Sequence, residues 1–173
     1  RLLESCSDDR KWPVLVAATE DPSPLIRSSA ASALAGHRTA ESRRALVRAT
    51  EDDYRLVRIR AAASLSLHSL SRLNESEMKS VQRATAEYED YLRCGPDQWS
   101  SHYNLANYYV NRGQLQEALK EFNLASRLQP NSIPPLVNAS MIYARLGQSQ
   151  TAESKLRQAY DVDPQNSIVN FNL

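Results

Sequence analysis

The chain has 173 residues, 42% of them hydrophobic and 24% charged, which suffices for an ordinary core and argues against a disordered chain. The 21 Lys and Arg residues almost balance the 20 Asp and Glu residues, so the net charge of +1 gives no general attraction to nucleic acid or an anionic membrane. No apolar run approaches the ~20 residues that cross a bilayer, and we expect neither nucleic-acid binding nor membrane insertion.

Apolar residues recur at steps of three and four almost throughout, and no segment shows the sustained alternation of a strand. The sequence therefore predicts an all-α protein. In chain order, we expect helices at residues 10–20, 23–36, 40–51, 54–69, 75–94, 98–112, 115–128, 133–146 and 149–162, and the start of another at residue 167.

An internal repeat with a period of 31 occupies the first seventy or so residues. The segment 14–21 reads again as 45–52, and Arg27 reads again as Arg58. Such self-similarity marks stacked helical units that bury their apolar faces against neighbouring copies. The units resemble HEAT-type repeats, over residues 1–73. This resemblance implies that an acidic and a basic residue of each unit form a ladder between repeats, here Asp21, Arg27, Asp52 and Arg58, with a ligand site as the alternative.

Cap residues divide the first half of the chain into helices. Asp21 lies just before Pro24, a residue suited to the first turn of a helix, and can accept hydrogen bonds from the free amides there. Asn74 and Glu77 have the spacing of a capping box. We therefore expect a long helix from residue 75, which joins the two repeat systems.

A second repeat, with a period of 34, begins at about residue 84. Five positions return 34 residues later: Tyr109, Gly113, Ala118, Ala125 and Pro130 as Tyr143, Gly147, Ala152, Ala159 and Pro164. These units resemble tetratricopeptide repeats. We expect residues 74–173 to hold a degenerate unit up to about residue 98, full units at 99–132 and 133–166, and a truncated unit at 167–173. Both resemblances together imply a right-handed α-solenoid of stacked antiparallel helix pairs.

The chain opens on Arg1 and both of its ends fall inside a repeat. We therefore expect a fragment of a larger protein. Repeat ends of this kind expose faces that another repeat would normally cover, so self-association through them is a further hypothesis.

Three asparagines share one position of the 34-residue repeat: Asn104, Asn138 and Asn172. In tetratricopeptide proteins the first helix of each unit lines the concave groove, so the resemblance implies that this column and Asn107 face a ligand. An amide offers both a donor and an acceptor, and it can pair with the backbone of an extended peptide whatever the peptide's side chains. The alternative is that the asparagines only brace neighbouring helices.

Hydrogen bonds alone would hold such a peptide weakly. Each contributes about 0.5–1.5 kcal/mol net, whereas ordering a flexible segment costs about 2–5 kcal/mol. Apolar burial must add to them, and we expect it at Tyr103, Val110, Met141 and Phe171, with Arg145 available for an acidic side chain.

No pattern of catalytic or metal-binding residues is evident. Cys6, His37 and His68 are 31 residues apart, but equivalent side chains of neighbouring repeats lie roughly 10 Å apart, too far to share one metal. The Cys-x-x-Cys-His, glycine-rich phosphate and His-Glu-x-x-His motifs are absent. We therefore predict no catalytic residue, no metal and no cofactor. The only basic cluster, arginines between residues 43 and 60, could meet a phosphate backbone or an acidic peptide, but the acidic residues interleaved with it favour a compensated surface.

The sequence therefore predicts a non-enzymatic protein–protein interaction scaffold that binds an extended peptide or a partner protein in its tetratricopeptide groove. The alternative is an accessory repeat region of a larger enzyme, with catalysis outside this segment. The two kinds of repeat resemble regions that are appended to bacterial multihaem cytochromes. The compartment stays open, with the bacterial periplasm as one candidate.

Overall fold

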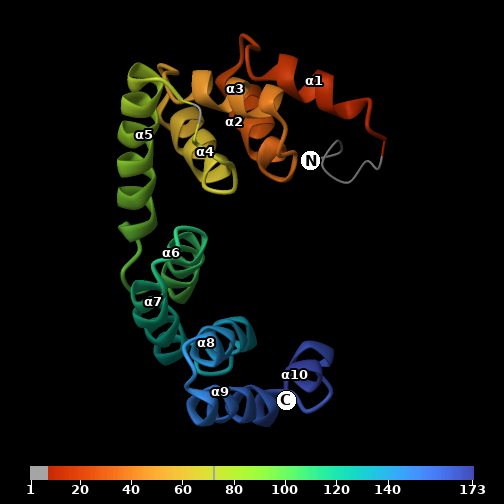
Figure 1. Cartoon of the computed structure of the whole chain (residues 1–173), viewed down its shortest axis with the longest axis vertical. Coiled ribbons are helices and arrows are strands. Elements are labelled where there is room, and N and C mark those ends of the chain that lie inside the picture. Colours follow the sequence, from red (N-terminus) through yellow and green to blue (C-terminus); the bar gives the residue numbers. More distant parts are fainter. Residues whose placement is uncertain (1–7, 72) are drawn as a thin grey trace. The chain divides into compact units, whose positions relative to one another are not determined.

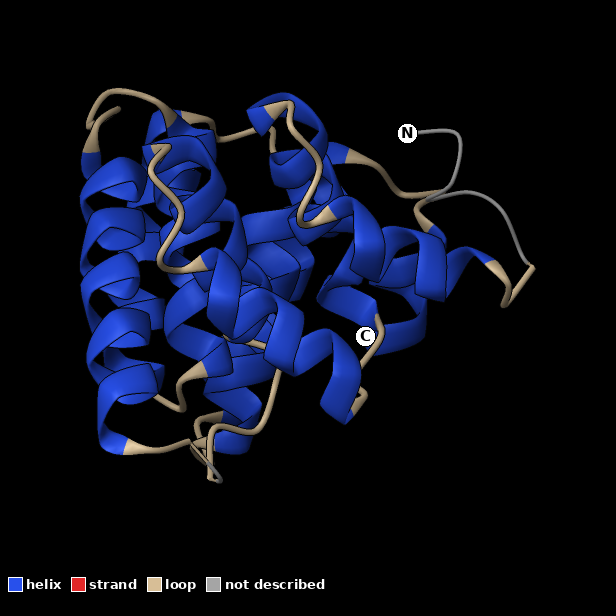
Figure 2. Ribbon diagram, turned by 90° about the horizontal axis from the view of Figure 1, so that it is seen from above, coloured by secondary structure: helices blue, strands red, loops and turns tan. Residues whose placement is uncertain are grey.

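The computed structural model describes residues 8–71 and 73–173, and all regular secondary structure in these ranges is helical (Figures 1 and 2). The predicted all-α fold of stacked helix pairs is confirmed. None of the described helices is long and apolar enough to span a membrane. The helices are α1 (Lys11–Ala18), α2 (Pro24–Ala33), the 3₁₀ helix η1 (Leu34–Gly36), α3 (Ala40–Ala49), α4 (Arg55–Leu65), α5 (Glu75–Arg93), α6 (Trp99–Asn111), α7 (Leu115–Leu128), α8 (Ile133–Arg145), α9 (Ser149–Val162) and α10 (Ser167–Asn172).

Four helices of the first repeat system end earlier than the sequence predicts, because the chain tightens at their C-termini. The amides of Thr19 and Thr50 bond carbonyls three residues back, and their hydroxyls donate to the same carbonyls, at 2.7 and 2.6 Å. These bonds replace the last α-helical turn. Helix α2 passes into η1 after Ala33, and α4 ends at Leu65 rather than residue 69, where the amides of Leu67 and His68 also bond three residues back.

The chain packs as two compact units, Arg1–Tyr91 and Leu92–Leu173, and the division falls in the last turn of α5. In the first unit, α2 and α3 pack on α4 around a core in which Leu34, Leu46 and Val57 are fully buried. Helix α5 adds Val81 to this core. The predicted capping box starts α5: the amides of Asn74 and Glu77 each bond the other's side chain at 2.9 Å.

The second unit consists of the pairs α6–α7 and α8–α9, with α7 against α8 and α10 against α9 (Figure 1). Small residues at the helix contacts allow close packing: Ala106, Ala118, Ala139 and Ala159 are fully buried. Gly113 and Gly147 connect the helices of each pair with φ of 72° and 75°, a region that favours glycine. These contacts position α6, α8 and α10, the helices that carry the candidate binding residues.

Candidate functional site

A hydrogen-bonded cluster of three polar side chains joins α6 to α8. The Asn138 amide nitrogen donates to Asn107 Oδ1 at 3.1 Å and to the Tyr103 hydroxyl at 3.4 Å. Asn138 is half-buried, so part of the asparagine column braces consecutive helix pairs. The side-chain amide of Asn138 has two N–H groups, enough for these two partners. Its side-chain oxygen, Oδ1, is then the atom that a ligand could use.

The other two asparagines of the column lie in different surroundings. Asn104 is exposed, and its side chain makes no hydrogen bond within the described residues. The Asn172 amide nitrogen donates to the Ile168 carbonyl of its own helix at 2.7 Å. The three asparagines therefore share one repeat position but not one environment.

Two aromatic rings pack against the ring of Tyr103. Its ring lies 5.8 Å from that of Phe122, which is fully buried, and 6.0 Å from that of Trp99, both tilted as aromatic pairs prefer. The buried core of the α6–α7 pair thus positions the hydroxyl that Asn138 contacts.

A hollow of about 450 Å³ lies among α8, α9 and α10 and brings together three of the predicted binding residues, Met141, Arg145 and Asn172. Leu156 and Leu173 also line it. Met141 is 52% exposed, which leaves an apolar group open to a ligand. A methionine side chain adapts readily to irregular apolar partners.

The hollow also contains an uncompensated positive charge. Within the described residues, Arg145 has no carboxylate partner, although Glu153 lines the same hollow. The Glu153 carboxylate is instead bound by Arg157, one helical turn along α9, at 2.7 Å. An apolar group beside a cation suits a ligand that carries both an apolar and an acidic side chain.

In the first unit, Arg27 links consecutive repeats. Its guanidinium donates to both Asp52 carboxylate oxygens, at 2.6 and 2.9 Å, and to the backbone carbonyl of Asp21 at 2.8 Å. This hydrogen bonding to Arg27 holds the pKa of Asp52 below its usual value. The Asp21 carboxylate has a local role, because it accepts from the Ser23 amide at 2.8 Å. Of the four predicted ladder residues, Arg27 and Asp52 pair through their side chains, and Asp21 meets Arg27 through its backbone carbonyl only.

The next arginine uses an acceptor that the repeat pattern does not contain. Arg58 donates to the backbone carbonyl of Asp52 at 2.7 Å and to the Glu87 carboxylate of α5 at 3.0 and 3.1 Å. The 31-residue period would place the acceptor at Arg83, which is basic, so the period could not have identified Glu87. The helical phase of α5 would have helped, because Glu87 lies one turn beyond Arg83 on the same face.

His37 and His68, two members of the predicted column, are both half-buried in the first unit. His37 stacks on Trp12 with ring centroids 4.1 Å apart, and its Nδ1 lies 2.8 Å from the Ser42 hydroxyl. Burial lowers the pKa of His68. Cys6, the third member of the column, lies outside the described residues. Across residues 8–71 and 73–173, no group of three or more His, Cys, Asp or Glu is placed to hold a metal ion.

Family models match the chain in two parts, which coincide with the regions of the 31-residue and the 34-residue period. The family model for HEAT repeats matches residues 1–66, and tetratricopeptide repeat models match residues 87–120 and 133–166. No curated protein matches the chain in sequence.

Solved structures with the same fold include MamA from Desulfovibrio magneticus RS-1, at 17% identity and a TM-score of 0.59 over 92% of this chain and 87% of that one. Another is YrrB, described as a TPR protein with an unusual peptide-binding site, at 16% identity and a TM-score of 0.58 over 94% and 81%. At these identities the similarity is one of fold. The two internal periods, the helix pairs and the family matches agree that the chain is a repeat protein, with HEAT repeats followed by tetratricopeptide repeats.

Proposed function

We propose that the chain is a non-enzymatic scaffold whose second unit binds an extended peptide, or an extended segment of a partner protein, across α6, α8 and α10. The observation that carries this proposal is the hollow lined by Met141, Arg145 and Asn172, which offers an open apolar side chain, an unpaired cation and an amide together. Both repeat families are typically non-catalytic interaction modules.

The proposed ligand carries an apolar residue and, close to it, an Asp or Glu. The apolar residue would bury against Met141 and Leu156, and the carboxylate would pair with Arg145. Asn104 is the open amide of the column and would bond the peptide backbone. Neighbouring units lie roughly 10 Å apart, which matches about three residues of extended chain, so the surface accommodates about six or seven residues. We expect micromolar affinity.

The test uses a synthetic array of seven-residue peptides that contain one Leu or Met and one Glu, and a matched array with Lys in place of Glu. The wild-type protein should bind members of the Glu array and not their Lys counterparts. Arg145→Glu should weaken the selected peptides at least about tenfold, since a charge-assisted hydrogen bond contributes about 1.5–3 kcal/mol. Fluorescence anisotropy measures both.

Lys155→Glu is the matched control, because Lys155 lines a different hollow of the same unit, between α7 and α9. It reverses the same charge and should leave the affinity unchanged. Equal losses for the two variants would show that the peptides respond to overall charge, and the proposed site would be wrong. An array in which no Glu peptide binds would reject the proposal for this ligand class.

A further inference from the structure

His102 near the start of α6 is placed between two oxygen atoms. Its Nδ1 lies 2.7 Å from Glu121 Oε2, and its Nε2 lies 2.8 Å from the backbone carbonyl oxygen of Pro96. The His102 and Glu121 side chains are only 14% and 23% exposed. Neither contact belongs to the candidate peptide surface.

The two contacts require different numbers of protons on the ring. A backbone carbonyl and an ionised carboxylate are acceptors only, and a neutral imidazole carries a single N–H. A neutral His102 could therefore donate to one oxygen, and its other nitrogen would set a lone pair against the second oxygen. Only the imidazolium form donates to both.

Three groups surround the ring: the Glu121 carboxylate of α7, the Pro96 carbonyl and the Asp97 carboxylate, the latter two from the turn between α5 and α6. Burial by itself would lower the pKa of His102, but the hydrogen bonds to Glu121 and Pro96 and the nearby negative charges outweigh it. The pKa of His102 is therefore raised above its ordinary value of 6.5.

The turn that His102 holds lies tightly on α6. A Cβ added at Gly95 would lie 2.6 Å from Ser101 Oγ, so the backbone of this turn lies against the first helical turn. The Gln98 amide bonds the Gly95 carbonyl at 3.0 Å. A protonated His102 therefore ties three segments of the second unit together: the turn at residues 95–98, α6 and α7.

We propose that His102 is a proton-operated brace, which in its protonated form fixes the 95–98 turn to α6 and α7 and which releases the Pro96 carbonyl when it loses a proton. The proton that leaves is the one on Nε2, because the hydrogen bond to the charged carboxylate is the stronger of the two. The folded form has the higher proton affinity, so the brace stabilises the unit fully below the unfolded-state value of 6.5. This contribution is lost as the pH rises through the folded-state value.

The test is a histidine-detected NMR titration of the full chain, in which His102 should titrate above 6.5 and become the Nδ1–H tautomer at high pH. Over the pH range in which His102 loses its proton, the hydrogen-exchange rates of the Gln98 and Ser101 amides should increase. The increase should exceed the one that pH alone causes in an unstructured chain. Glu121→Gln should lower the pKa of His102, because it removes the charged hydrogen-bond acceptor. Glu117→Gln, an exposed carboxylate one turn earlier on α7, should leave it unchanged.

A His102 that titrates at or below 6.5 in the wild-type chain would overturn the proposal, whether or not the Glu121 variant folds. Identical shifts in the Glu121 and Glu117 variants would also overturn it, because they would assign the effect to overall charge. Peptide binding plays no part in either outcome.

Discussion

Replacement of Phe122 by alanine should lower the free energy of unfolding of the Leu92–Leu173 unit by about 3–5 kcal/mol, the usual cost of emptying a fully buried aromatic site. Phe122 belongs to the core shared by α6, α7 and α8, and its ring supports Tyr103. Urea unfolding followed by circular dichroism measures the loss. Phe122→Leu should cost about 1–2 kcal/mol, which keeps the test informative if the alanine variant does not fold.

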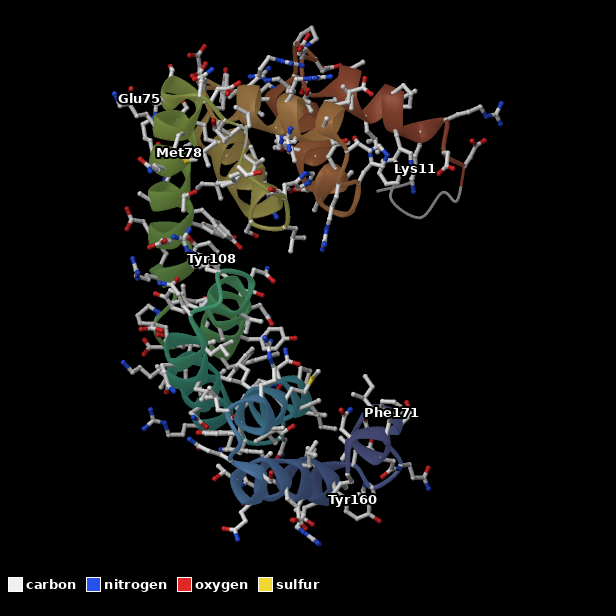
Figure 3. All side chains as sticks on the ribbon, in the orientation of Figure 1. Lys11, Glu75, Met78, Tyr108, Tyr160 and Phe171 are labelled. Carbon is white, nitrogen blue, oxygen red and sulfur yellow. The ribbon has the colours of Figure 1, made fainter. Side chains whose placement is uncertain are left out.

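The chain contains only two phenylalanines, and the second provides the control. Phe171 is 90% exposed and stands out from α10 (Figure 3). Phe171→Ala should change stability by no more than about 0.5 kcal/mol. A similar loss in both variants would mean that the packing described for α6, α7 and α8 is wrong.

Asp52→Ala should lower the stability of the first unit by about 2–3 kcal/mol. The substitution removes a bidentate ion pair with Arg27 and the acceptor of the Tyr54 amide hydrogen bond. The pair is well shielded from water, since the Arg27 and Asp52 side chains are 15% and 10% exposed. The pKa of Asp52 is lowered, so this contribution is present above the unfolded-state value of 3.8 and is lost as the pH falls through the folded-state value. Thermal unfolding at pH 7 and below pH 3.8 should therefore show a smaller difference between wild type and variant in acid.

Glu20→Ala is the matched control, because Glu20 also pairs with an arginine, Arg48, at 2.9 Å. That pair is largely exposed, with side-chain exposures of 67% and 57%, and it should contribute no more than about 0.5 kcal/mol. If the two variants lose equal stability, Asp52 has no special role in joining the repeats.

The helices were predictable from the sequence because their boundaries depend on local chemistry. The capping box of Asn74 and Glu77 and the glycines at 113 and 147 lie where the pattern places them. The tight C-termini at Thr19 and Thr50 were missed, since their threonine hydroxyls compete for the last helical carbonyls without altering the apolar pattern.

Side-chain partners were less predictable, because they depend on packing between helices. The 34-residue spacing identified the asparagine column, but equal spacing did not imply equal contacts: Asn138 bonds α6, Asn172 bonds its own helix and Asn104 is exposed. Glu87 as the partner of Arg58 lies outside the period. The brace at His102 was also missed, because Glu121 and Pro96 come near it only when α7 and the 95–98 turn pack on α6.

Methyl NMR of the two methionines tests the proposed peptide surface most directly. Met141 lines the hollow of the second unit, whereas Met78 lies on α5 in the first unit and serves as an internal control (Figure 3). When a peptide selected from the Glu array is added, the Met141 methyl signal should shift saturably and the Met78 signal should not. A bound peptide that shifts neither signal, or shifts Met78 alone, would contradict the assignment of the binding surface to α8 and α10.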